Sequence, residues 1–263
     1  MPRGPEIEQT EDKDGVFTFK LASWKHFAKF ISRDMLEYNH YIWRGQADPT
    51  WKLESSLDRL AKRFGKKPSA NLRRHHLRRF KKAARGRRGR SPRDLENENE
   101  WWALGQHYGL ATPLLDWTTS PFVALYHAFR SPDPVSGNRM VFGLHAPTLV
   151  DSAKTKPGEE PKQGVPLPFS PDSDENPRLV NQAGNFIRMP DGIDLEGWVV
   201  REFRGTSGDS TLIKVKIPTT GRSECLTTLN RMNINHLSLF PDLYGSVIHA
   251  NMEFGIPGYR GFA

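Results

Sequence analysis

The sequence predicts an α+β domain with a mixed, mostly antiparallel sheet, helices on one side of the sheet and a projecting basic helix. Strand-like and helix-like segments alternate without the regular period of a parallel α/β fold. The 37% hydrophobic content of the 263 residues suits a chain that buries a large core. Residues 1–15 are acidic and contain Pro and Gly, so we expect a flexible lead-in before one domain at residues 16–263.

The first elements are expected at residues 16–21 and 24–35. Residues 16–21 alternate between apolar and polar side chains, as a half-buried strand does. Residues 24–35 follow the helix-capping Ser23 and place their aromatic side chains at helical spacing, so we expect those side chains in the core. Residues 51–64 predict a further strand, turn and helix.

Residues 41–46, YIWRGQ, run from strand-forming side chains directly into an arginine and a glycine. Arg44 therefore lies where a strand leaves the core, and its guanidinium can fork around a phosphate or carboxylate. Gly45 would let a backbone or a ligand approach closely. The alternative for Arg44 is a structural ion pair with a nearby carboxylate.

Residues 106–130 contain more structural signals than any other stretch of the chain. They predict a strand over 110–115, a polar turn and a helix over 122–129. Ser120 followed by Pro121 is a helix-start signal, because serine caps free amides and proline at the first helical position loses no hydrogen bond.

The polar turn is expected to place Asp116, Trp117, Thr118 and Thr119 at a strand end beside a helix N-terminus. Free N–H groups and the positive end of the helix dipole favour phosphate or carboxylate at such a corner. The alternative is that Asp116 and the two threonines only cap the helix and close the turn.

A helix over residues 94–107 is predicted just before this stretch. Its two faces carry different side chains, with Trp102 and Gln106 on one and Trp101, Leu104 and Tyr108 on the other. Gln106 and His107 lie at the helix end, next to the central stretch. A histidine in this position serves as a structural hydrogen-bonding group or as a catalyst.

Residues 61–93 predict a basic helical arm, helical over 71–85 and flexible beyond. No acidic residue interrupts its positive side chains, which include Arg73, Arg74, Arg78, Arg79, Lys81, Lys82, Arg85, Arg87, Arg88 and Arg90. Like charges at this density repel one another unless a polyanion screens them, so the arm and the net charge of +8 predict a nucleic-acid partner. An acidic partner protein, such as an antitoxin, is the alternative.

The second half of the chain predicts strands at residues 139–145, 198–200 and 211–217 and a helix over 223–232. Residues 176–187 have strand character around 179–180 and 186–187, with Gln182 and Gly184 between. Residues 147–176 lack periodicity and are rich in Pro, Gly, Ser and acids, so we expect a long mobile loop that serves as a lid. Residues 238–245 close the domain, and a Gly/Pro-rich tail follows.

Several common functional motifs do not occur in the sequence. It lacks GxxxxGK[ST], GxGxxG, HExxH and GxSxG, and its histidines and single cysteine show no metal-ligand spacing. Cys225 cannot form an intrachain disulfide, which fits a reducing compartment. No apolar run reaches membrane length and the N-terminus lacks an apolar signal segment, so we expect a cytoplasmic protein without a membrane partner.

Five motifs resemble the FRG domain family, which is named for its aromatic-Arg-Gly motif. They are YIWRGQ at 41–46, QHYGLAT at 106–112, LLDWTTSP at 114–121, ALY at 124–126 and LFPDL at 239–243. Residues 181–186, NQAGNF, resemble the Gln-x-Gly-x-Phe element of that family. This chain departs from the family pattern in two places. Pro113 stands where many members carry arginine, and the basic arm looks like an elaboration of the family's domain.

A second, more distant resemblance is to ADP-ribosyltransferases. These enzymes present an arginine or histidine on one strand, a Ser-Thr-Ser-like strand followed by an Ala/Phe-rich helix, and a later strand with glutamate. Arg44 is similar to the first element, residues 117–129 are similar to the second, and residues 176–186 lie where the third is expected. The resemblance implies an ADP-ribosyltransferase-like fold and NAD as the substrate.

The resemblance also implies roles for individual residues. Arg44 would anchor the NAD phosphates or ribose, and Thr118 and Thr119 would hold the ribose. Residues 147–176 would recognise the target. Further contacts to NAD are expected from Gln46, Gln106, His107 and Thr112.

The catalytic carboxylate is left open by the sequence. Glu175 lies one or two residues before the expected position, Asp116 lies on the central stretch, and Glu253 is a distant alternative. Gln182 could orient a ribose hydroxyl, although an amide is no base.

The leading hypothesis is therefore a toxin-like ADP-ribosyltransferase acting on RNA or DNA, in a toxin–antitoxin or phage-defence setting. A non-catalytic nucleic-acid-binding module and a nuclease that uses Asp116 and Glu175 with magnesium are the alternatives. The transferase requires Arg44 and Thr118 to face one dinucleotide-sized cleft.

Overall fold

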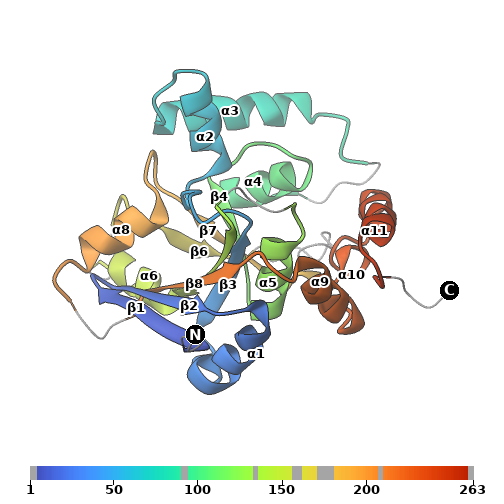
Figure 1. Cartoon of the computed structure of the whole chain (residues 1–263). Helices are drawn as coiled ribbons and strands as arrows, with labels where there is room; N and C mark the ends of the chain where they lie inside the picture. Colours follow the sequence, from blue (N-terminus) through green and yellow to red (C-terminus); the bar gives the residue numbers. More distant parts are fainter. Residues whose placement is uncertain are drawn as a thin grey trace.

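A computed structural model describes residues 5–89, 94–132, 136–155, 162–170, 181–206 and 210–259. Over these residues one eight-stranded sheet runs in the order β1-β2-β8-β5-β3-β4-β7-β6 (Figure 1). Strands β2 and β8 are parallel, and the other described pairs are antiparallel. The predicted α+β class with a mixed, mostly antiparallel sheet is confirmed.

The strands and helices alternate irregularly along the chain. The strands are β1 (Ile7–Lys13), β2 (Val16–Leu21), β3 (Tyr41–Gln46), β4 (Leu114–Thr118), β5 (Asn138–His145), β6 (Leu167–Phe169), β7 (Gly184–Arg188) and β8 (Leu212–Pro218). The helical segments are η1 (Trp24–His26), α1 (Phe27–Phe30), η2 (Ile31–Met35), α2 (Ser56–Arg63), α3 (Ala70–Ala83), α4 (Glu98–His107), α5 (Pro121–Phe129), α6 (Ala146–Ala153), α8 (Leu195–Glu202), α9 (Arg222–Arg231), α10 (His236–Leu239) and α11 (Leu243–Gly255).

Helices cover both faces of the central sheet, so the prediction of helices on one side was wrong (Figure 1). On one face α1, α5 and α9 pack against alternate residues of the strands, such as Val141. On the other face α6 and α8 pack against the residues between them, such as Phe142. Strand β5 is apolar on both faces, and a sheet of that kind needs a cover on each side.

A third apolar cluster joins α2, α3 and α4 to the sheet. It contains Leu57, Leu77, Trp102, Leu114 and Phe186. Helix α3 lies outermost and carries the basic side chains, as the sequence predicted (Figure 1). Because α4 packs against both α3 and β4, it links the basic helix to the sheet.

Three predicted segments differ from the structure. Residues 7–13, expected in a flexible lead-in, form edge strand β1 paired with β2. Residues 198–200, expected as a strand, lie in α8, where Asp194 caps the helix and Trp198 packs against the sheet. The loop expected at 147–176 begins as α6 and contains β6, while its residues 156–161 and 171–176 lie outside the described ranges.

Arg73 anchors the basic helix to the body of the domain. Its guanidinium donates to the buried Asp58 carboxylate at 3.2 Å and to the Pro190 carbonyl at 2.9 Å, and it is ion-paired with Asp191. The Gly192 N–H donates to the same Asp58 carboxylate at 3.0 Å. Arg73 is therefore a structural residue, and the prediction that it contacts nucleic acid is corrected.

We expect Arg73→Ala to lower the free energy of unfolding by about 3 kcal/mol, because the change leaves the buried Asp58 carboxylate without its cation. The neighbouring Arg74 is exposed, so Arg74→Ala should change stability by less than about 0.5 kcal/mol. Urea unfolding of the two variants measures both stability changes. Equal stability of both would contradict the assignment.

Candidate functional site

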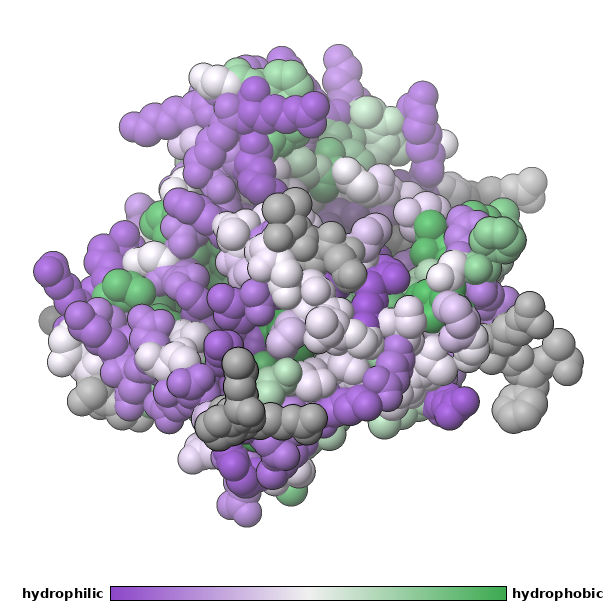
Figure 2. All heavy atoms as spheres, in the orientation of Figure 1, coloured by the Kyte–Doolittle hydropathy of each residue, from purple (hydrophilic) through white to green (hydrophobic). Residues whose placement is uncertain are grey.

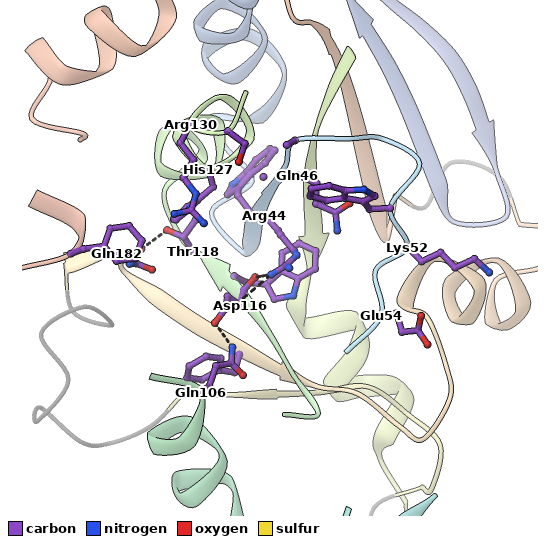
Figure 3. Close-up of a pocket in the computed structure, with 18 of the residues that line it drawn as sticks. Arg44, Gln46, Lys52, Glu54, Gln106, Asp116, Thr118, His127, Arg130 and Gln182 are labelled. Carbon is purple, nitrogen blue, oxygen red and sulfur yellow. Dashed lines mark hydrogen bonds and ion pairs between the residues drawn. The ribbon is translucent and has the colours of Figure 1, made fainter. Parts of the chain in front are cut away.

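A cavity of about 740 Å³ lies beside the point where β3 meets β4. The two strands are joined there by a single residue pair, Trp43 with Thr118. Side chains from β3, β4, α4 and α5 line the cavity, together with Gln182 and Phe240 (Figure 3). Arg44 and Thr118 both face this cavity, so the convergence that the sequence hypothesis required is present.

Arg44 lies on β3 with its guanidinium in the cavity, and its side chain is 19% exposed. Its Nη1 donates to the Asp116 backbone carbonyl at 2.6 Å and lies 3.8 Å from the Asp116 carboxylate. Among the described residues, its buried Nε has no hydrogen-bond acceptor. Burial lowers the pKa of Arg44 from its ordinary value, and the Asp116 charge only partly opposes this effect. The positive charge of the guanidinium is thus only partly balanced by Asp116, and the group suits an anionic ligand.

Gln46 ends β3 on the same cavity wall. The residue is 6% exposed, and within the described part of the chain its buried Oε1 accepts no hydrogen bond. A buried amide oxygen without a donor is unfavourable by about 1–3 kcal/mol, so this position favours a ligand that supplies a hydroxyl or N–H.

Asp116 is held by a short chain of hydrogen bonds. The strand prediction is corrected here, because β4 covers residues 114–118 and Asp116 lies within it rather than after it. Gln106 Nε2 donates to Asp116 Oδ1 at 2.5 Å, and the Thr112 hydroxyl donates to Gln106 Oε1. The Asp116 side chain remains 62% exposed toward solvent and the cavity. The carboxylate is therefore oriented and still accessible.

Two predicted NAD contacts lie away from the cavity lining. Thr112 is fully buried, and it orients Gln106 rather than facing the cavity. Thr119 is exposed, and its N–H donates to the Ala183 carbonyl at 3.0 Å. Their roles are structural, because Thr112 also accepts from the Leu114 N–H at 3.3 Å and Thr119 links β4 to the segment before β7.

Thr118 and Gln182 join the cavity to the C-terminal segments. The Thr118 hydroxyl donates to the Gln182 carbonyl at 2.6 Å and accepts from the Ser120 N–H at 3.0 Å. Gln182 Nε2 donates to the Leu239 carbonyl at 3.0 Å. These bonds hold the QAG and LFP motifs against β4, which explains why motifs far apart in the sequence belong to one site.

The cavity also contains basic residues that the sequence analysis missed. His127 on α5 and Arg130, which follows the helix as its C-cap, lie on the Thr118 side, and Lys52 lies on the opposite side (Figure 3). Burial and the charges of Arg130 and Arg44 lower the pKa of His127 to about 3, so the ring is neutral near pH 7. The i, i+3 spacing of His127 and Arg130 on the predicted helix is the signal that could have found them.

Asp116 is the carboxylate most accessible to the cavity within the described ranges. Glu54 also lines it, but its carboxylate is buried and paired with Lys62. Glu253 lies on α11, is ion-paired with His249 at 3.3 Å and does not line the cavity. Glu175 lies outside the described residues. No group of three potential metal ligands occurs in the part of the chain that the structure describes.

The basic helix presents most of its predicted side chains to solvent, and Figure 2 shows hydrophilic side chains over this part of the molecule. Lys81 and Arg88 instead lie over the Trp101 ring, 5.2 and 4.9 Å from its centroid. Arg90 lies outside the described residues. The exposed members are Arg74, Arg78, Arg79, Lys82, Arg85 and Arg87.

The fold and site define an α+β domain with a polar cavity in which the partly buried Arg44 is the central group. Residues 39–136 match the FRG domain family, the family that the motifs of the sequence resemble. A search of curated proteins and a search of solved structures each found no match. The matched segment runs from before β3 past α5 and includes Arg44, Gln106 and Asp116. No described helix is both long enough and apolar enough to cross a bilayer.

Proposed function

We propose that this protein is an ADP-ribosyltransferase that uses NAD as its substrate and modifies a nucleic acid. The observation that carries the proposal is the partly buried Arg44 guanidinium in the cavity wall, whose Nε has no acceptor among the described residues. A volume of about 740 Å³ lies within the range of small-molecule sites. The aromatic walls, including Trp43, Trp51 and Trp117, suit the flat rings of a dinucleotide.

Arg44 and Arg130 would hold the pyrophosphate, since both are cations on the cavity wall. The Asp116 carboxylate, fixed by Gln106, would accept a hydrogen bond from the ribose and stabilise the positive charge that develops at C1′. The glycosidic bond to nicotinamide breaks and its electron pair leaves with the ring. An oxygen or nitrogen of the nucleic acid then bonds to C1′, and its proton passes to Asp116 or to solvent.

This activity fits a toxin that acts in the cytoplasm, in a toxin–antitoxin or phage-defence setting. An acidic partner protein could neutralise it by covering the basic helix, because the exposed arginines there offer the opposite charge.

A non-catalytic nucleic-acid-binding module is the second candidate. The pairing of Trp101 with Lys81 and Arg88 favours it, because such cation–aromatic clusters bind nucleic acid without any chemistry. The nuclease hypothesis has less support, because Asp116 is surrounded by the donors of Arg44 and Gln106 rather than by further carboxylates.

Incubation of the protein with NAD labelled in its adenylate phosphate and with RNA, DNA and protein should transfer the label to a nucleic acid. Asp116→Asn should reduce this transfer at least about 100-fold, because the amide carries no negative charge. It should leave nucleic-acid affinity unchanged. Asp151→Asn, a change of an exposed surface carboxylate, is the matched control. If NAD stays intact with every nucleic acid, the transferase proposal is wrong.

A further inference from the structure

We infer that the nucleic acid recognised by this protein is single-stranded and that one of its bases stacks on Tyr108 at the mouth of the cavity. This inference rests on the proposed function only for the modification of the bound strand by ADP-ribose. Tyr108 is 76% exposed although it is a large aromatic side chain. Its ring lies 4.7 Å from the ring of His107, which lines the cavity.

Trp101, on α4, provides a second aromatic ring. It lies seven positions before Tyr108, the residue that follows the helix, so the helical rise places the two backbone positions roughly 10 Å apart along the axis. Lys81 and Arg88 lie over Trp101. Their charges are positioned to hold a phosphate there, while the open ring of Tyr108 is available to a base.

The basic helix supplies the remaining phosphate contacts. Helix α3 packs against α4, Arg78 and Lys82 are exposed on α3, and Arg85 is exposed just after it. No acidic residue occurs between Arg73 and Gly89 to repel the strand. Helix α4, which packs against α3, ends at His107, and His107 lines the cavity that contains Asp116.

An exposed ring favours an unpaired strand for a physical reason. Bases in a duplex already have both faces covered by their neighbours, so Tyr108 can stack only on a base that has left the stack. A base held at the mouth can also place the atom that receives ADP-ribose inside the cavity. A base within a duplex cannot do so.

Fluorescence anisotropy with labelled 12-nucleotide RNA and DNA, single-stranded and duplex, tests the inference on the full chain. A single strand should bind more tightly than the duplex. Tyr108→Ala should weaken single-strand binding roughly tenfold, whereas Tyr108→Phe should retain it. Tyr244→Ala, which removes an exposed tyrosine from α11, is the matched control. Arg78→Ala should weaken binding to both forms and reduce the salt dependence.

Equal affinity for single strand and duplex, or no effect of Tyr108→Ala, would overturn the inference. Transfer of ADP-ribose is measured separately on the same oligonucleotides. Stacking on Tyr108 without any transfer would support this inference and contradict the transferase. Transfer to duplex alone would support the transferase and contradict the stacking site.

Discussion

Arg44→Ala should lower ADP-ribose transfer at least about 1,000-fold while the protein stays folded. The guanidinium is the cation nearest to Asp116 in the cavity, and removal of such a charge-stabilising donor has effects of that size. Arg44→Lys should recover only part of the activity, because an ammonium cannot reproduce the fork of the guanidinium. Transfer from labelled NAD measures both variants, and Arg74→Ala, on the exposed surface of α3, is the control.

The stability of Arg44→Met separates a ligand-binding arginine from a structural one. Because the Arg44 Nε has no acceptor within the described ranges and its partner Asp116 is largely exposed, a methionine of similar length should leave stability unchanged or raise it. If Arg44 were instead a structural ion pair, the change would lower the free energy of unfolding by several kcal/mol. Thermal unfolding of the variant in the absence of NAD decides between the two.

Gly45→Ala should be the most destabilising single-methyl change on β3. A Cβ at this position would lie 1.8 Å from the Ala124 carbonyl oxygen and 2.6 Å from the Ala128 nitrogen, both backbone atoms of α5. Backbone cannot yield as a flexible side chain does, so we expect a loss of about 3 kcal/mol or more.

Gly255→Ala is the control for this prediction, because a Cβ there meets nothing within 4 Å. For a domain of this size the Gly45 variant should melt at least about 6 °C lower, and the Gly255 variant close to the wild type. Equal melting temperatures would show that α5 does not press on β3 as described.

The predictions for Arg44 and Gly45 explain the aromatic-Arg-Gly motif, because each of its three neighbouring residues has a separate role on β3. Trp43 is buried in the core, Arg44 reaches into the cavity, and Gly45 admits the backbone of α5. The sequence left open whether a backbone or a ligand approaches Gly45, and the structure shows a backbone. The motif thus fixes the cavity wall and its central charge together.

Local signals predicted much of the fold. Strand β2 was predicted with its observed bounds, and the Ser120–Pro121 signal placed the start of α5, because alternation and capping depend on neighbouring residues. Strand β3 was expected to leave the core at Arg44, whereas it continues to Gln46. Residues 195–202 contain Trp and two valines and resemble a strand, yet packing on the sheet and the Asp194 cap make them α8. Strand β1 is polar, and only its pairing with β2 defines it.

The site was predictable only where a motif names the residue. Arg44, Gln106, Asp116 and Gln182 were predicted and meet in the cavity. Arg73 was assigned to nucleic acid because its partner Asp191 is distant in the sequence, and Thr112 was assigned to NAD because its bond to Gln106 is hidden in the fold.

A crystal structure of the protein soaked with ADP-ribose tests the central claim most directly. We expect the diphosphate within hydrogen-bond distance of the Arg44 guanidinium, with a ribose hydroxyl near the Asp116 carboxylate. ADP-ribose bound away from the cavity, or a cavity that stays empty at saturating ligand, would contradict the account.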